Sequence, residues 1–543
     1  MNSIPQRFQK ATRWADQRAE PLILLAITAA ALLLFTANLG GVPLRDWDEG
    51  TVAGVAQDLA ERPLEQWLYP TLHGEPYFNK PPLMHSLIAL SFNAFGVNEW
   101  AARLPGALLS ALGVPLLYLV GRELWPGRLT ALLGSTVYLS LLPVVRHGRL
   151  AMLDGASTSF FLVTLLSLLR SRRHPRWGFG VGVGLSLMLL TKGVLGLLLG
   201  AIALAFILWD APRVLRSPYA WVGVLLGLVP AASWYSLQGL RYGSEFWAVH
   251  LFDQSLERVW TAVERNQGPP WFYGVELLKL AWPWLLFLPM GLRLAWRDRW
   301  RSGGKLLLVW GIGYLGVISL MGTKLPWYVY PLYPPLALLV GVELKRLWEN
   351  IDGYSAQLQP TVKYRRTLRL GLGLLAVIFW GGSIYFWVTG SSPLLAMSLL
   401  GIGLTLTAAQ WQLSQRRPLF APVLLWGLYV SLLAFVVSDQ WVWELAEDYP
   451  VKPVAALINA HVPPEAKLLT SHPHRRPSLE FYSDRPVRPA AGPRLRRQWP
   501  RGAYLLVDQS LLQRPWAPAR GVGQAADWVI LAPPATNSAI QEK

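Results

Sequence analysis

Long apolar runs, separated by short polar connectors, make up most of the chain between residues 21 and 438. A transmembrane helix needs about 20 apolar residues to cross a hydrocarbon core of about 30 Å. Thirteen runs reach or approach that length. They cover residues 21–39, 103–121, 129–145, 151–169, 177–191, 193–209, 219–238, 272–292, 305–322, 327–344, 369–389, 394–413 and 420–438. The pattern therefore predicts an all-α polytopic membrane protein with about thirteen transmembrane helices.

A further apolar run, residues 83–95, is short and is interrupted by four polar residues. If it crossed the membrane, the Lys and Arg clusters of the later connectors would lie outside. Keeping it at the surface places those clusters in the cytoplasm, as the positive-inside rule requires. We therefore expect a juxtamembrane or re-entrant helix here and a cytoplasmic N-terminus. The resulting outer loops are residues 40–102, 146–150, 191–193, 239–271, 323–326, 390–393 and everything after 439.

The first outer loop, residues 40–102, is acidic, with eight acidic residues against three basic ones. Inside it, Val52, Val55, Ala56 and Leu59 recur at helical spacing. This spacing predicts a short amphipathic helix at the membrane interface, starting just after Asp48 and Glu49.

The sequence changes character after residue 439, where it becomes rich in proline and has no spanning run. Strand-like runs at 466–470 and 503–508 follow a helical run at 454–460. These runs predict a small extracytoplasmic α/β domain. We thus expect two domains, a transmembrane domain over residues 1–439 and a periplasmic domain over residues 440–543.

Composition supports a membrane protein, since only 15% of the residues are charged, 53% are hydrophobic and the mean hydropathy is +0.31. The net charge of +18 lies mainly in short connectors, where it anchors cytoplasmic loops. We therefore expect a lipid bilayer, and no nucleic acid, as the partner of these basic residues. The chain has no cysteine, which excludes disulfides, thiolate nucleophiles and Cys-type zinc sites.

Carboxylates gather where two spans meet the outer face. Asp48 and Glu49 follow the first span, and Asp154 opens the fourth. The alternative is that Asp46 or Asp48 only caps the amphipathic helix, because acidic residues favour the first turn. Ionisable groups at the depth of Asp154 are costly and mark functional sites. The alternative for Asp154 is a structural ion pair with Arg146 or Arg149.

Four cations also lie near the membrane plane on the outer side, which suits an anionic lipid phosphate. They are Lys80 in FNKPPL, Arg149 in RHGRLAMLD, Lys192 in LLTKGVLG and Lys324 in MGTKLPWYVYPLYPP. A lysine that snorkels to the interface is the alternative for Lys80. The aromatic stretch from Trp327 to Tyr333 is suited either to lining a lipid or sugar groove or to an aromatic belt. His73, His85 and His250 match no metal motif, so surface histidines are expected.

The ordered set of these motifs resembles the protein O-mannosyltransferase superfamily of polyprenyl-phosphate-dependent membrane glycosyltransferases, and in particular its ArnT-like, or aminoarabinose transferase, branch. The resemblance covers residues 40–340 by motif. It implies a GT-C fold, a polyprenyl-phosphate sugar donor and transfer at the periplasmic face of the bacterial inner membrane. The implied acceptor is a lipid A-type glycolipid, a glycan or a protein, and we expect a monomer.

The resemblance also implies roles for single residues. The essential first-loop aspartate of the family falls on Asp48, with Glu49 beside it, and its second aspartate falls on Asp154. The lysine of the family's Lys-Pro-Pro element falls on Lys80. Its phosphate-facing lysine and its later Lys-Leu-Pro segment fall on Lys192, Lys324 and Tyr328. Family members often have Glu before the Lys-Pro-Pro lysine, a residue associated with a bound metal, where this chain has Asn79. The sugar and a divalent metal ion as cofactor therefore stay open.

These residues suit glycosyl transfer. Cations at positions 80, 149, 192 and 324 would stabilise the charge that develops on the departing phosphate. Asp48 would act as general base toward an acceptor hydroxyl, and direct displacement would invert the anomeric carbon. If the acceptor is already a phosphate, as on lipid A, no base is needed, and Asp48 would orient groups or hold a metal. Arginines 475, 476, 494, 496 and 497 either attract an anionic acceptor or form a solvated basic surface.

Two other classes of protein compete with this interpretation. A transporter or flippase would place ionisable groups near the midplane and show paired halves with broken helices, whereas the charges here gather at one face. A glycan polymerase or ligase would share the topology and the basic residues. It would not need the Asp-Glu pair beside the Lys-Pro-Pro element.

Overall fold

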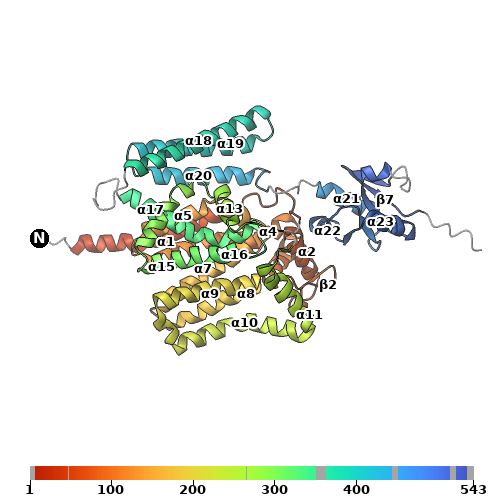
Figure 1. Cartoon of the computed structure of the whole chain (residues 1–543), viewed down its shortest axis with the longest axis horizontal. Coiled ribbons are helices and arrows are strands. Elements are labelled where there is room, and N and C mark those ends of the chain that lie inside the picture. The colour runs from red at the N-terminus through yellow and green to blue at the C-terminus, as the bar shows by residue number, and fades with distance from the viewer. Residues whose placement is uncertain are drawn as a thin grey trace, which may run out of the picture. The chain divides into compact units, whose positions relative to one another are not determined.

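Helices account for most of the described residues up to residue 442 (Figure 1). The computed structural model describes residues 6–46, 48–263, 266–349, 362–442, 450–513 and 521–534. Within these ranges, seven helical segments are long and apolar enough to cross a membrane. They are Ala19–Thr36 of α1 (Gln6–Thr36), α4 (Glu99–Leu124), α10 (Pro218–Tyr242), Ser302–Leu320, α18 (Val362–Thr389), α19 (Pro393–Ser414) and α20 (Phe420–Val437). An eighth span results if α5 (Arg128–Leu139) and α6 (Leu142–Gly148), bent by 61°, are taken together.

The other predicted spans coincide with shorter helices. These are α7 (Asp154–Ser171), α8 (Gly178–Lys192), α9 (Val194–Asp210), and η8 (Pro326–Leu332) followed by α17 (Tyr333–Glu349). The span predicted at 272–292 is broken into α13 (Phe272–Leu280), η6 (Trp284–Leu286) and α14 (Leu288–Arg297). Pro283 lies in the break, where a residue without an N–H interrupts the helical ladder. A helical multi-span membrane protein is thus confirmed, and the number thirteen stays a prediction.

Small residues allow the closest helix contacts. A Cβ atom on Gly182 of α8 would lie 2.2 Å from the Val224 oxygen of α10, and one on Gly227 would lie 2.5 Å from the Val183 nitrogen. Close approach of backbones through small residues is typical of membrane helices, because lipid supplies no hydrophobic driving force. The helices α18, α19 and α20 likewise pack side by side (Figure 1).

The chain forms two compact units. The first comprises residues 1–41, 78–84 and 103–441, and the second comprises residues 42–77, 85–102 and 442–543. The second unit therefore combines most of the first outer loop with the C-terminal segment. Residues more than 400 positions apart in the sequence thus belong to one unit.

The outer-loop part of the second unit contains α2 (Asp48–Ala60), a hairpin of β1 (Thr71–Leu72) and β2 (Glu75–Pro76), and most of α3 (Leu83–Phe95). Helix α2 begins at Asp48, one or two residues before the predicted start, and buries the predicted apolar face formed by Val52, Val55, Ala56 and Leu59. Helix α3 has the predicted bounds. Its position at the membrane surface stays a prediction.

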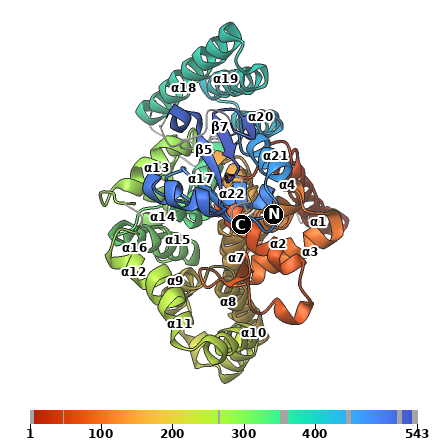
Figure 2. The same ribbon diagram turned by 90° about the vertical axis from the view of Figure 1, so that its right-hand side faces the viewer.

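The C-terminal part contains a five-stranded mixed sheet. Its order is β4 (Val487–Pro489), β3 (Leu468–Thr470), β5 (Tyr504–Asp508), β7 (Trp528–Leu531) and β6 (Gly523–Ala525). Strand β3 pairs in parallel with β4 and β5, and the other pairs are antiparallel. Alternate residues of β3 point to opposite faces, since Leu468 packs with α21 (Val451–His461) and Leu469 packs with Leu495 of α23 (Gly492–Gln498). Figure 2 shows α21 beside β5 and β7. A small C-terminal segment with helices and a mixed sheet is thus confirmed, and its extracytoplasmic location and its bounds stay predictions.

Candidate active site

The first unit contains a buried ion pair between two residues that the sequence singled out. Asp154 is 2% exposed, and its Oδ1 accepts a hydrogen bond from the ammonium of Lys192. Its Oδ2 lies 3.6 Å from Nε2 of His147. A buried carboxylate needs such partners, because an unpaired charge in a low-dielectric interior costs several kcal/mol. The alternative pairing with Arg146 or Arg149 is therefore wrong.

Local helix geometry places both members of this pair. Asp154 is the first residue of α7 and Lys192 is the last of α8, so each side chain carries the charge that its helix end favours. Gly193 then ends α8 with a φ of +57°, a backbone conformation that glycine adopts without strain. A Cβ atom at Gly193 would lie 3.2 Å from His250 Nε2 and 3.3 Å from the Tyr235 hydroxyl. The turn therefore packs directly against these two side chains.

Aromatic rings border the ion pair. The ammonium of Lys192 lies 5.8 Å from the ring centre of Tyr328, and the Tyr328 hydroxyl lies 3.5 Å from a terminal nitrogen of Arg258. The His147 ring stacks on Trp327 with centroids 6.3 Å apart. The structure thus brings together the predicted Asp154, Lys192 and Tyr328, and it adds His147 and Arg258, which sequence reasoning missed. His147 had one signal, its position in the same RHGRLAMLD motif as Asp154.

Lys80 belongs to a segment that His250 holds in place. His250 Nδ1 donates to the main-chain oxygen of Phe78 at 2.7 Å, and its Nε2 lies 3.2 Å from the Tyr235 hydroxyl. Burial lowers the pKa of His250, and the positive charge of Lys80 lowers it further. His250 is 4% exposed, so the expectation of a surface histidine is wrong. Through Gly193 and Phe78, His250 connects the Lys192 turn with the Lys80 segment.

Arg149 and Lys324 bind main-chain oxygens at helix ends. Arg149 is fully buried, and its terminal nitrogens donate to Leu34 at 2.7 Å and to Ala37 at 2.5 Å near the end of α1. Lys324 is 4% exposed and donates to the oxygens of Ile318 and Ser319. Burial lowers the pKa of Lys324. Both side chains are thus bound to main-chain oxygens, and the phosphate contacts that the sequence predicted for them stay predictions.

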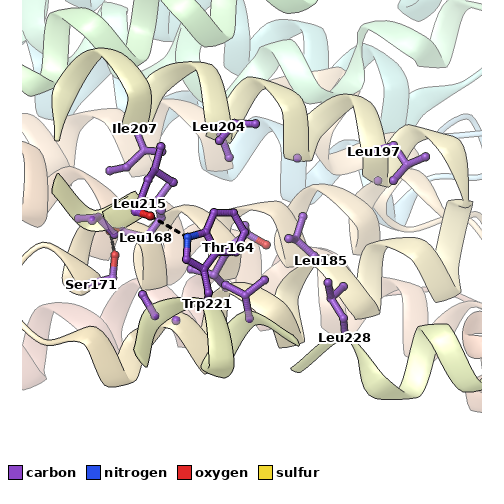
Figure 3. Close-up of a pocket in the computed structure, with 18 of the residues that line it drawn as sticks. Thr164, Leu168, Ser171, Leu185, Leu197, Leu204, Ile207, Leu215, Trp221 and Leu228 are labelled. Carbon is purple, nitrogen blue, oxygen red and sulfur yellow. Dashed lines mark hydrogen bonds between the residues drawn. The ribbon is translucent and has the colours of Figure 1, made fainter. Parts of the chain in front are cut away.

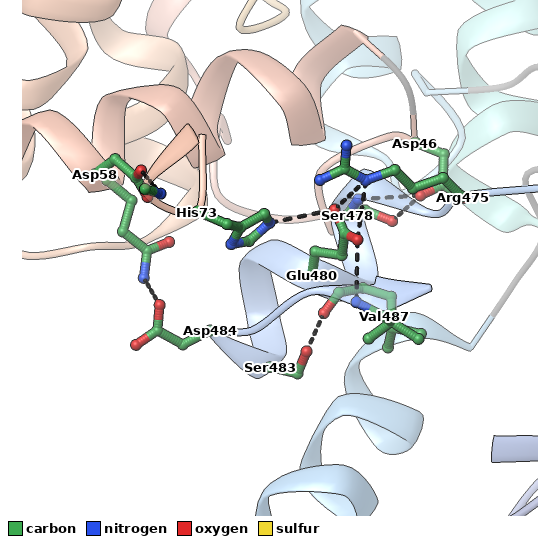
Figure 4. Close-up of polar contacts among 12 residues, drawn as sticks. Asp46, Asp58, His73, Arg475, Ser478, Glu480, Ser483, Asp484 and Val487 are labelled. Carbon is green, nitrogen blue, oxygen red and sulfur yellow. Dashed lines mark hydrogen bonds and ion pairs between the residues drawn. The ribbon is translucent and has the colours of Figure 1, made fainter. Parts of the chain in front are cut away.

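In the second unit, the carboxylates near the start of α2 have different environments. Glu49 is fully buried, and its Oε2 accepts from the Arg45 main-chain nitrogen at 3.0 Å. Asp46 is buried and contacts Ser478 (Figure 4). It also pairs with Arg476. Asp48 is partly exposed, and a capping role for Asp46 or Asp48 stays a prediction. Burial raises the pKa of Tyr77, and the negative charge of Asp48 raises it further.

The five arginines predicted to attract an acceptor separate into two groups. Arg475 pairs with Glu480 and Arg476 pairs with Asp46. Arg494, Arg496 and Arg497 are exposed on α23. Of these five arginines, the three on α23 are therefore the ones that could still attract an anionic acceptor or form a solvated basic surface.

The residues around Asn79 do not fit a metal ion. Both ring nitrogens of His250 lie within hydrogen-bonding distance of protein oxygens. Over the ranges that the structure describes, no three His, Asp or Glu side chains gather into a metal-binding group. No step of the reaction is therefore assigned to a metal.

An apolar pocket lies among α7, α8, α9 and α10 in the first unit (Figure 3). Its volume is about 290 Å³, and its lining includes Leu168, Leu185, Leu204 and Trp221. No charged residue lines it. The pocket therefore suits a hydrocarbon chain and offers no cation for a phosphate.

Comparison with known proteins places this arrangement among the glycosyltransferases. Residues 79–236 match the family model described as dolichyl-phosphate-mannose-protein mannosyltransferase. The undecaprenyl phosphate-alpha-4-amino-4-deoxy-L-arabinose arabinosyl transferase of Pseudomonas paraeruginosa is 30% identical over 396 residues, which is 70% of each chain. A similar transferase from Pseudomonas fluorescens is 29% identical over 429 residues, covering 76% of this chain and 73% of its own.

The fold is similar to that of a solved structure, ArnT from Cupriavidus metallidurans bound to undecaprenyl phosphate. The TM-score is 0.77 at 19% identity, over 94% of this chain and 98% of that chain. Fold and relatives together define a membrane glycosyltransferase of the polyprenyl-phosphate type. The chain belongs to the undecaprenyl phosphate-aminoarabinose transferases, the ArnT-like family. The family resemblance predicted from the motifs is confirmed, and a transferase is favoured over a flippase or a glycan polymerase.

Proposed function

We propose that the protein transfers 4-amino-4-deoxy-L-arabinose from undecaprenyl phosphate to a lipid A-type glycolipid at the periplasmic face of the bacterial inner membrane. The names of the relatives support the donor and its sugar. The solved ArnT structure, which contains undecaprenyl phosphate, supports the lipid carrier. Within this chain, the proposal rests chiefly on the buried pair of Asp154 and Lys192 beside Tyr328.

The reaction breaks the bond between the anomeric carbon and the phosphate oxygen, and the bonding electrons remain on the phosphate. Lys192 and Lys80 would stabilise this growing negative charge, because preorganised cations act most strongly where water is scarce. Asp154 would hold the ammonium of Lys192 in position toward the phosphate through their hydrogen bond. The acceptor oxygen forms the new bond from the opposite side, which inverts the anomeric carbon.

Asp48 would accept the proton of an acceptor hydroxyl as general base. A phosphate acceptor on lipid A carries no proton that must leave, and Asp48 would then orient the acceptor. Arg494, Arg496 and Arg497 on α23 would attract an anionic acceptor. Arg149, Lys324 and Glu49 take structural roles in this scheme.

We also propose a topology of thirteen spans, with the N-terminus in the cytoplasm and residues 440–543 in the periplasm, acting as a monomer. A helix or a run of short helices occupies each of the thirteen predicted positions. Arg122 and Arg128, in the connector between the second and third spans, both pair with Glu20 near the start of the first. These ion pairs support a cytoplasmic N-terminus, because the N-terminal end of the first span lies beside a basic connector and basic connectors are cytoplasmic by the positive-inside rule.

The test is transfer by the purified protein in proteoliposomes, with undecaprenyl-phosphate aminoarabinose and lipid A, read by mass spectrometry. Asp48→Asn should abolish transfer while leaving insertion intact. Lys80→Ala should raise the KM for the donor. Glu75→Gln, which changes an exposed acid of the same loop, is the matched control and should keep activity.

Two results would contradict the proposal. Normal turnover in Asp48→Asn would remove Asp48 from the mechanism. Envelope lipids that are identical in cells with and without the protein would refute the lipid acceptor itself.

A further inference from the structure

We infer that the C-terminal helix α22 (Pro477–Ser483) is a clamp that positions the helix carrying Asp48, which makes Arg476 and Ser478 positioning residues of the transfer reaction. The inference rests on the proposed role of Asp48. It assigns the C-terminal segment a function in arranging the catalytic loop, in addition to any contact with an acceptor. All of the residues involved belong to the second unit.

The first attachment lies two residues before Asp48. Asp46 is 6% exposed, and its Oδ1 accepts hydrogen bonds from the main-chain nitrogen of Ser478, at 3.1 Å, and from the Ser478 hydroxyl. Its Oδ2 lies 2.5 Å from Nε of Arg476. Hydrogen bonds that involve ionised groups are roughly twice as strong as neutral ones. Both oxygens of Asp46 are thus bound to the C-terminal segment, and Figure 4 shows the contact with Ser478.

The second attachment lies two residues after Asp48. A Cβ atom on Gly50 would lie 2.3 Å from the Ser478 nitrogen and 2.6 Å from the Pro477 carbonyl carbon. The backbones of α2 and α22 therefore meet directly, and only glycine permits this approach. Further along α2, Gln57 Nε2 donates to Asp484 Oδ1 at 2.8 Å.

The third attachment holds the hairpin of the same loop. Glu480 of α22 is 2% exposed, and its Oε2 lies 3.2 Å from Nε2 of His73. The same carboxylate accepts from Arg475 at 2.7 Å and from the Val487 main-chain nitrogen at 3.0 Å. The loop is therefore fixed to α22 at Asp46, Gly50 and His73.

Asp48 lies between the first two of these attachments, in the first turn of α2. Its position consequently depends on residues about 430 positions later in the chain. A displacement of about 1 Å in a reacting group can lower the rate about 100-fold. Loosening α22 should therefore slow the chemical step while leaving the binding of the donor unchanged.

The first experiment measures kcat and donor KM for full-length variants in proteoliposomes. Arg476→Ala and Gly50→Ala should each lower kcat by about 100-fold with little change in KM. The matched controls are Arg501→Ala and Gly54→Ala. Arg501 is an exposed arginine of the same unit, and a Cβ at Gly54 would meet only a leucine methyl at 3.0 Å. The kcat of both controls should stay within about twofold of that of the unsubstituted protein. Arg476→Lys keeps the charge and should recover part of kcat.

The second experiment reports on the clamp without using activity. Because the chain has no cysteine, Ala53→Cys introduces a single thiol. Ala53 is fully buried and lies one helical turn from Gly50, on the same face of α2. In the Ala53→Cys background, Arg476→Ala should increase the rate of maleimide labelling about tenfold or more, since loss of one partner exposes the loop through local opening. Arg501→Ala should leave the labelling rate unchanged.

The two readouts separate the outcomes. Faster labelling together with a lower kcat supports the clamp as a positioning device. Faster labelling with normal kcat overturns the positioning role, and unchanged labelling with normal kcat overturns the clamp. Should Arg476→Ala not insert, Gly50→Ala and Arg476→Lys give the same two readouts. If Asp48→Asn retains turnover while Arg476→Ala shows faster labelling, the proposed role of Asp48 has failed and the clamp has not.

Discussion

Replacement of Asp154 by asparagine tests the buried ion pair most directly. The substitution keeps the size of the side chain and removes its charge, so that Lys192, whose side chain is 11% exposed, loses its partner. Breaking a buried pair costs about 3–5 kcal/mol in the free energy of unfolding. The lower end, about 3 kcal/mol, applies here, because the lysine retains some access to water and to the ring of Tyr328. Transfer should fall about 100-fold or more, since Lys192, the cation that we propose faces the phosphate, is no longer held.

The assay is a double-mutant cycle that combines Asp154→Asn with Lys192→Met. The free energy of unfolding in detergent and the rate of transfer are measured for both single variants and for the double variant. The double variant should regain most of the stability, because it buries no unpaired charge, and it should remain inactive.

Glu343→Gln supplies the matched control. Glu343 is fully buried and pairs with Arg346 at 2.7 Å in α17. The substitution should lower stability by a similar amount and leave transfer unchanged. A coupling energy below about 0.5 kcal/mol between Asp154 and Lys192, the level expected of independent sites, would refute the pair as a structural and catalytic unit.

Two further predictions concern residues outside the reacting centre. Arg149→Ala should lower the free energy of unfolding by about 3 kcal/mol or more, because it leaves buried main-chain oxygens of Leu34 and Ala37 without a donor. The KM for the donor, measured on the protein that remains folded, should not change. A large rise in this KM would show that Arg149 binds the donor phosphate. Burial, and then the charge of Arg476, lowers the pKa of His472, which accepts from Arg476 at 2.9 Å only when neutral. The stability that His472 contributes is thus complete above its ordinary pKa of 6.5 and is lost as the pH falls below it. Unfolding measured from about pH 7 to pH 5 should show this loss in the second unit, and His472→Gln should flatten the profile; an equal slope in both proteins would contradict the assignment.

The strength of the local sequence signals explains what could be predicted. Apolar runs located a helix or a run of short helices at each of the thirteen predicted positions, and they missed the helical turns of residues 244–260, which the sequence left in an outer loop. The 3.6-residue spacing of Val52, Val55, Ala56 and Leu59 gave the buried face of α2. Length and periodicity are properties of contiguous residues, and they survive whatever the rest of the chain does. The family motifs also lie within short segments, which is why they could be recognised.

The roles of single charged residues could not be predicted in the same way. Lys80, Arg149, Lys192 and Lys324 look alike in the sequence, as single cations beside apolar runs. In the structure, Arg149 and Lys324 hold helix ends through main-chain oxygens. Lys192 pairs with a carboxylate. The difference lies in which acceptor each side chain reaches after folding.

The sequence by itself determined that this protein is a helical membrane glycosyltransferase with a small C-terminal α/β domain, because hydrophobic length, periodicity and short motifs are written locally. Only the tertiary structure decided which charges meet. Asp154 pairs with Lys192, which lies 38 positions later in the chain, and Ser478 binds Asp46, which lies 432 positions earlier. The choice of partner for a buried charge depends on packing that brings distant segments within about 3 Å, and no local pattern in the sequence encodes that distance.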